Sequence, residues 1–250
     1  MKHLYSAIMT LAAVSALSVG ANAAIGADAR IESAVHKSFV YRHYLKNDDI
    51  KVKSKDGVVV LTGSVSEDYH KTLANDAAAA QTGVSSVDDR LAVKAGGPAA
   101  GSDAWLIGKV KAVLLFHRSV SAVETTVDAK DGIVTLRGSA ESTAQKDLTS
   151  EYAGDVDGVK SVDNELTVAK APSRTRRAER GIDDASITAE VKLTLLFHRS
   201  TSALSTQVRT AHGVITLSGK AATAAEKDLA GKIAGDVKGA KSVTNDIRVE

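Results

Sequence analysis

Apolar and polar residues follow the same order three times along this chain. Each copy opens with apolar residues spaced four apart, which marks one face of a helix: Ile31, Val35 and Phe39, then Leu106, Val110 and Leu114, then Ile187, Val191 and Leu195. Two extended runs with alternating apolar residues follow, joined by a turn, and the second run closes at Gly63, Gly138 or Gly219. A second helical pattern and a last strand complete each copy. The pattern predicts one α-β-β-α-β module written three times.

Turn and cap residues support the same reading. Asp28, Asp103 and Asp184 stand before the three first helices, where Asp is a good N-cap. The paired strands are joined by Asp56-Gly57, Asp131-Gly132 or His212-Gly213, which favours a tight hairpin turn because both turn residues need positive φ. Each module is therefore expected to be a small α+β unit, a three-stranded sheet with two helices packed on one face.

The most similar stretch of the repeats is Leu114-Leu115-Phe116-His117-Arg118-Ser119, which returns as Leu195-Leu196-Phe197-His198-Arg199-Ser200. On a helix, the first Leu of each copy faces the core. We expect the His and Arg to lie at a solvated helix end, where a cation also favours the helix dipole. Phe116 and Phe197 fall at the margin of the buried stripe, so partial core burial and a binding role both stay open.

These patterns divide the chain into six segments. They are a signal peptide at 1–23, a module at 24–95, a Gly-rich linker at 96–102, a module at 103–170, a basic linker at 171–182 and a module at 183–250.

The first 23 residues resemble a secretory signal. A basic start at Lys2 is followed by an uncharged, mostly apolar run, and Ala21-Asn22-Ala23 offers small residues to a signal peptidase. The alternative, an uncleaved membrane anchor, is disfavoured because Ser and Thr interrupt a run that is short for a span. We expect cleavage after Ala23, export to the periplasm and no transmembrane span in the mature chain.

Composition removes several classes of function. The chain has no Cys, which excludes disulfides, thiol catalysis and Cys-based zinc sites. Its formal net charge is only +2, and it has no aromatic sheet platform, so nucleic-acid binding does not fit. No catalytic motif or phosphate-binding loop is present, and the cation beside each helix-end His disfavours metal. We expect a protein that is not an enzyme and needs no cofactor or metal.

A few residues remain as binding candidates. Trp105 is the single Trp, and its equivalents in the other copies are Arg30 and Ser186, so the module itself does not require an apolar side chain there. An exposed Trp suits a membrane interface or a protein contact, whereas packing on a neighbouring module is the structural alternative. The predicted lipid- or partner-binding set is Trp105, Phe116, Arg118, Phe197 and Arg199, with Arg174, Arg176, Arg177 and Arg180 of the basic linker.

One family shares this arrangement of motifs. The run Asp131-Gly132-Ile133-Val134-Thr135-Leu136-Arg137-Gly138, followed about twenty residues later by Gly158-Val159-Lys160-Ser161-Val162-Asp163-Asn164, resembles the BON domain. The third copy matches with His212 in place of the turn Asp, and the first matches with Asp89 in place of the Asn. The signal peptide makes the chain similar to the osmotically inducible periplasmic members of that family, here with a third module.

The resemblance implies a non-catalytic protein that binds phospholipid surfaces and supports the envelope under osmotic or other envelope stress. We therefore expect peripheral, reversible binding to anionic phospholipid. The alternative is a periplasmic chaperone-like or scaffolding protein that binds envelope proteins.

Overall fold

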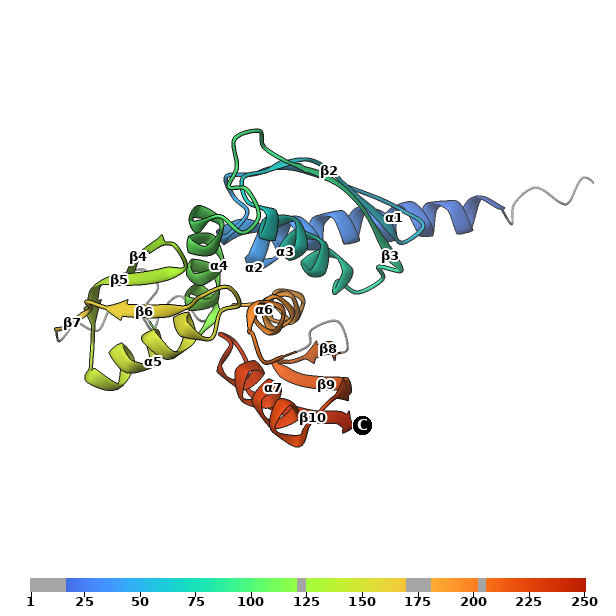
Figure 1. Ribbon diagram of the computed structural model, residues 1–250. Helices are drawn as coiled ribbons and strands as arrows, with labels where there is room; N and C mark the ends of the chain where they lie inside the picture. The colour runs from blue at the N-terminus through green and yellow to red at the C-terminus, as the bar shows by residue number, and fades with distance from the viewer. Residues whose placement is uncertain (1–16, 121–124, 170–180, 202–205) are drawn as a thin grey trace, which may run out of the picture.

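Three small sheets, each with its own helices, make up the structure (Figure 1). The computed structural model describes residues 17–120, 125–169, 181–201 and 206–250. The first module contains α1 (Leu17–Lys37), α2 (Phe39–His43), β1 (Asp49–Lys55), β2 (Val58–Val65), α3 (Asp68–Ala79) and β3 (Ser86–Val93). The second contains α4 (Asp103–Phe116), β4 (Thr125–Lys130), β5 (Ile133–Ala140), α5 (Thr143–Gly154), β6 (Ser161–Asn164) and β7 (Thr167–Val168). The third contains α6 (Asp184–Phe197), β8 (Thr206–Ala211), β9 (Val214–Ala221), α7 (Ala224–Asp236) and β10 (Ser242–Val249).

Every module has the same sheet topology, which confirms the predicted α-β-β-α-β order. The first two strands form an antiparallel hairpin, and the last strand lies parallel to the second because a helix crosses over between them. In the second module β6 and β7 both pair with β5 and together take the place of that last strand. Alternate side chains of the central strand enter the core, as Val59 and Leu61 do in β2.

The central strands run two residues beyond Gly63, Gly138 and Gly219, which were expected to end them. Gly63 has φ +115°, and a Cβ there would collide with the Asp49 carbonyl oxygen on β1. Glycine thus allows the hairpin to continue where two backbones approach closely.

Asp28, Asp103 and Asp184 do not cap helices, so that prediction was wrong. Ser102 caps α4 by accepting from Trp105 N–H at 3.2 Å, and Asp183 caps α6 by accepting from Ser186 N–H at 3.0 Å. Asp103 lies one residue further on, and its two carboxylate oxygens accept from the turn N–H groups of Asp131 at 2.9 Å and Gly132 at 3.1 Å. Asp28 and Asp184 hold the other two turns in the same way. The hairpin is therefore tied to the start of α4 and α6, and in module 1 to the middle of α1.

The first helix of module 1 also differs from the single helix that was expected. It breaks at Ser38, whose hydroxyl donates to Val35 O at 2.8 Å and accepts from Tyr41 N–H. The predicted cleavage point after Ala23 falls within α1, while most of the predicted signal peptide lies outside the described residues.

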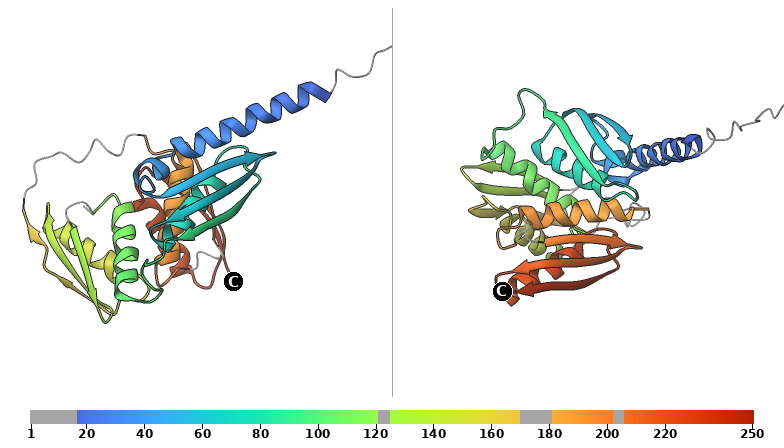
Figure 2. Two further views of the ribbon diagram at one scale, coloured as in Figure 1. Left: turned by 90° about the horizontal axis from the view of Figure 1, so that it is seen from above. Right: turned by 90° about the vertical axis from the view of Figure 1, so that its right-hand side faces the viewer.

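The modules pack against one another, with helices toward the centre and sheets on the outside (Figure 2). One apolar core joins the interiors of modules 1 and 2 and includes Ala189, Leu193 and Phe197 on the outer face of α6. The opposite face of α6 closes the separate core of module 3. Helix α6 is therefore the central element, buried from both sides.

Candidate functional site

Modules 2 and 3 are joined by two copies of one contact, which we call the module 2–3 joint. The chain becomes extended after α4 and α6, and His117 forms an antiparallel bridge with Val237 while His198 forms one with Val156. Arg118 N–H donates to Asp236 O at 3.0 Å and Lys238 N–H to Phe116 O at 2.9 Å. In the mirror contact, Arg199 N–H donates to Asp155 O at 2.9 Å and Asp157 N–H to Phe197 O at 2.8 Å.

On one side of the joint a partly buried polar cluster surrounds Asp236. Its Oδ2 lies 3.0 Å from His117 Nδ1 and accepts from the Tyr152 hydroxyl at 2.6 Å, and its Oδ1 accepts from the Ser119 hydroxyl. The His117 and Tyr152 rings stack with centroids 3.8 Å apart. Burial disfavours the charged carboxylate, but the hydrogen bonds from His117, Ser119 and Tyr152 outweigh it and lower the pKa of Asp236.

On the other side the equivalent pair is looser. His198 Nε2 lies 3.5 Å from Asp155 Oδ2, and the Arg199 guanidinium donates to the carbonyl oxygens of Gly154 and, at 2.9 Å, of Val159. Burial lowers the pKa of His198, although Asp155 acts in the opposite direction.

The predicted solvated helix end is therefore wrong for His117, whose exposed fraction is 1%. Phe116 and Phe197 are also buried, at 1% and 8% exposed, because the margin of each helix faces another module. Arg118 and Arg199 remain exposed, and Arg118 Nε lies 3.7 Å from Asp236 Oδ1. The four arginines of the basic linker, Arg174, Arg176, Arg177 and Arg180, lie outside the described residues.

Trp105 occupies a different place, at the N-terminal end of α4. It is half-buried and lines an open groove of about 520 Å³ together with Asp103, Gly132 and Lys160. The Lys109 ammonium lies 4.4 Å from the centroid of its ring, a cation–π distance. One face of Trp105 thus covers Lys109, while the groove borders the rest of the residue.

Lys109 and Glu190 were missed by the sequence analysis. They hold equivalent positions on α4 and α6, and both are buried. Lys109 Nζ donates to Asp157 O at 2.9 Å, whereas neither carboxylate oxygen of Glu190 has a hydrogen-bond partner in the described part of the chain. Burial raises the pKa of Glu190 well above its usual value, and Lys238 acts against this rise. The available signal was a charge at the same point of two apolar helices, where module 1 carries Ala34.

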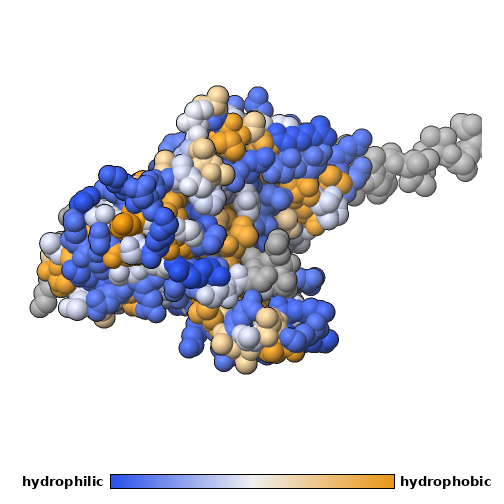
Figure 3. Space-filling model, in the orientation of Figure 1, coloured by the Kyte–Doolittle hydropathy of each residue, from blue (hydrophilic) through white to orange (hydrophobic). Residues whose placement is uncertain are grey.

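The rest of the described surface offers few further candidates for a functional site. Within the described ranges, no three His, Asp or Glu side chains gather as a metal site would need. No helix in that part of the chain is both long and apolar enough to cross a bilayer. Hydrophilic residues dominate the face drawn in Figure 3, and its hydrophobic residues form small separate patches.

The sequence profile of the BON domain matches residues 27–95, 102–170 and 183–250, which covers all three modules. The chain belongs to the BON domain family. The chain is 34% identical over 148 residues to "Osmotically-inducible protein Y" of Escherichia coli (strain K12), an alignment that covers 59% of this chain and 73% of that protein.

A second relative is the "Uncharacterized protein in gshII 5'region" of Anaplasma centrale, 29% identical over 148 residues, or 59% of this chain and 95% of that protein. Among solved structures, CdsD, a structural protein of the type III secretion system of Chlamydia trachomatis, aligns over 88% of this chain and 90% of its own, at 15% identity. The TM-score of 0.24 is too low for that likeness to carry an argument.

Proposed function

We propose that this BON protein is a non-catalytic periplasmic component of the cell envelope that acts under osmotic stress and binds anionic phospholipid surfaces peripherally. Family membership supports the envelope role, and the name of the Escherichia coli relative supports the link to osmotic induction. The signal-like first 23 residues support export.

The observation that carries lipid binding is the position of Trp105. An indole prefers the boundary between water and acyl chains, because its ring is apolar and its N–H is polar. Trp105 stands at a groove rim beside the exposed Lys160. The basic linker would add cations, each contributing roughly 1 kcal/mol near an anionic surface, whereas Arg118 lies beyond the opposite end of α4. The contact is small, so binding is weak and reversible.

The packing of the modules argues for one contact surface rather than three. The three sheets face outward in different directions (Figure 2). A flat membrane cannot contact all three sheets at once. The affinity for a membrane therefore gains nothing from avidity among separately tethered modules. Module 2 is the best candidate because it carries Trp105.

Vesicle co-sedimentation of the mature protein tests this proposal. Binding is expected to vesicles that contain phosphatidylglycerol or cardiolipin, to be absent with phosphatidylcholine alone, and to fall as salt rises. Trp105 is the only Trp, so its emission should shift to the blue when anionic vesicles are added.

Two variants locate the contact. Trp105→Ala and Lys160→Ala should each weaken binding, whereas Lys241→Ala, at the equivalent groove of module 3 where no Trp stands, should not. Absence of binding to anionic vesicles at low salt would refute the lipid proposal. Suppression of client aggregation in that case would favour the scaffolding alternative.

A further inference from the structure

Module 1 carries an open counterpart of the surface that modules 2 and 3 use to join. In those modules the loop after the second helix is covered by a helix end of the other module, through Val156 or Val237. The equivalent loop of module 1 is Ala80-Gln81-Thr82, with Gln81 half-buried and Thr82 exposed. We call this loop and the facing side of α1 the module 1 face.

The backbone groups that form the joint in modules 2 and 3 have equivalents in this loop of module 1. Asp157 N–H and Asp155 O each bond to the segment that covers module 2. Their equivalents are Thr82 N–H and Ala80 O, and within the described residues neither has a backbone hydrogen-bond partner. A polypeptide could bond to both without disturbing the module.

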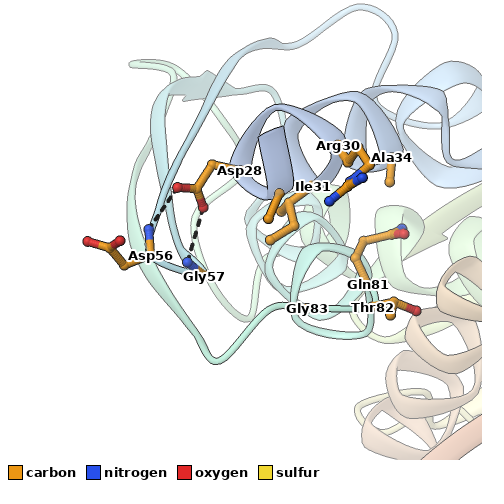
Figure 4. A pocket seen from close by; sticks show the side chains of 10 residues that line it. Asp28, Arg30, Ile31, Ala34, Asp56, Gly57, Gln81, Thr82 and Gly83 are labelled. Carbon is orange, nitrogen blue, oxygen red and sulfur yellow. Dashed lines mark hydrogen bonds between the residues drawn. The ribbon is translucent and has the colours of Figure 1, made fainter. Parts of the chain in front are cut away.

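The groove that modules 2 and 3 also carry at this end of the first helix reaches the loop in module 1, where Ala34, Gln81 and Thr82 line it as well. Ala34 stands where α4 has Lys109 and α6 has Glu190. With Ala27 and Ile31 it forms the apolar side of a groove of about 630 Å³. Figure 4 shows Arg30 on α1 and Gln81 and Thr82 on the loop bordering this space.

Two exposed cations border the module 1 face. Arg30 lines the groove, Lys37 lies two turns further along the same side of α1, and no ion pair engages either of them within the described part of the chain. The groove also has two carboxylates: Asp28 directs its own to the hairpin turn, as Figure 4 shows, and Asp56 lies at the turn itself. Arg30 and Lys37 thus remain available to an acidic segment, and the joint geometry favours a polypeptide.

We propose that the module 1 face docks an acidic polypeptide segment of another protein, through backbone hydrogen bonds to Ala80 and Thr82 and an apolar contact with Ala34. A second copy of this chain does not fit. Its two Phe-His-Arg segments are engaged in the module 2–3 joint, and its own first helix resumes as α2. Its exposed Arg30 and Lys37 would also repel those of an identical face.

A labelled protein and two defined peptides test the proposal. The chain has no Cys, so Ala79→Cys, exposed at the end of α3 beside the loop, gives a single attachment point for an environment-sensitive dye. Both peptides copy residues 191–200, the segment that covers module 2. One carries Lys192→Glu, His198→Glu and Arg199→Glu, and the other carries His198→Lys and Arg199→Lys. The acidic peptide should bind about tenfold more tightly than the basic one, as expected for a few exposed ion pairs.

Charge reversal supplies the controls. Arg30→Glu with Lys37→Glu should weaken binding of the acidic peptide about tenfold, whereas Lys130→Glu, exposed on β4 of module 2, should leave it unchanged. Trp105→Ala should also leave it unchanged, which separates this site from the proposed lipid contact. The proposal would be overturned if neither peptide bound or if both bound equally well. It would also be overturned if the Arg30 and Lys37 variant lost binding to vesicles but kept binding to the acidic peptide.

Discussion

A single carboxylate in each module holds a turn that is remote in sequence. Asp28, Asp103 and Asp184 each accept from two consecutive turn N–H groups, which point the same way because the first turn residue, Asp56, Asp131 or His212, has φ between 52° and 54°. The hydroxyl of Ser54, with the N–H groups of Gly57 and Asp56, lowers the pKa of Asp28. The turn and the first helix are thus one unit.

Removal of one such carboxylate should destabilise its module. Asp103→Ala leaves two turn N–H groups without their charged acceptor and should lower the free energy of unfolding by about 2 kcal/mol. Urea denaturation measures the change. Asp147→Ala, on the exposed side of α5, is the control and should change the free energy by less than about 0.5 kcal/mol. An equal loss of stability in the two variants would contradict the role of Asp103 in holding the turn.

At the scale of elements, the ends of α4 and α6 explain why their sequences agree so closely. Each end forms the same backbone bridge with the loop after the second helix of the other module. The two sides differ in polar detail, since Asp236 accepts hydrogen bonds from three side chains, whereas Asp155 has one His contact at 3.5 Å. The two halves of the joint therefore share the same backbone hydrogen bonds but differ in their side-chain hydrogen bonds.

This asymmetry gives a matched pair of variants. Asp236→Ala leaves His117, Tyr152 and Ser119 without their acceptor in a partly buried setting and should lower the free energy of unfolding by about 3 kcal/mol. Asp155→Ala, at the equivalent position with a side chain 42% exposed, should lower it by less than about 1 kcal/mol. Thermal and urea unfolding compare them, and a larger effect of Asp155→Ala would refute the assignment.

For the whole molecule, α6 is the element that holds the modules together. Asp183 and Ser186 at its start accept from Phe39 N–H at 2.7 Å and Val40 N–H at 3.0 Å of module 1, and Lys192 pairs with Asp76 at 2.8 Å. Glu190 lies fully buried among these contacts, and neither of its carboxylate oxygens has a partner at hydrogen-bond geometry in the described residues, although the Tyr44 hydroxyl is near enough to act against the rise of its pKa. A buried carboxyl of this kind makes the assembly sensitive to pH.

The sign of that sensitivity follows from the raised pKa of Glu190. A carboxyl whose folded pKa is raised contributes stability below its unfolded pKa near 4.5, and this stability is lost as the pH rises toward the folded value. Glu190→Gln should therefore raise the free energy of unfolding at pH 7 by about 1 kcal/mol and flatten its dependence on pH. Calorimetry between pH 4 and pH 8 tests this, with Glu151→Gln on the exposed side of α5 as control. A destabilised Glu190→Gln protein at pH 7 would contradict the argument.

Local patterns in the sequence were sufficient for the module. The spacing of Leu106, Val110 and Leu114 identified the buried face of α4, and alternation identified the strands, because helices and strands repeat with different periods. Asp131-Gly132 located the hairpin for a similar reason, since few residue pairs adopt positive φ in succession. The three-module architecture and the BON family therefore followed from residues near one another in the chain.

The surroundings of each module were decided only by the tertiary structure. Phe116, His117 and Phe197 looked like marginal or solvated positions because a helical pattern shows which face is buried within its own module, not what lies against the other faces. Contacts such as His117 with Asp236 join residues far apart in sequence, and no local pattern encodes them. Trp105 was identified as the residue that departs from the repeat, and its contact with Lys109 is a local one between residues four apart on α4. Its groove, in contrast, depends on how α4, the hairpin turn and the loop at Gly158 meet in space.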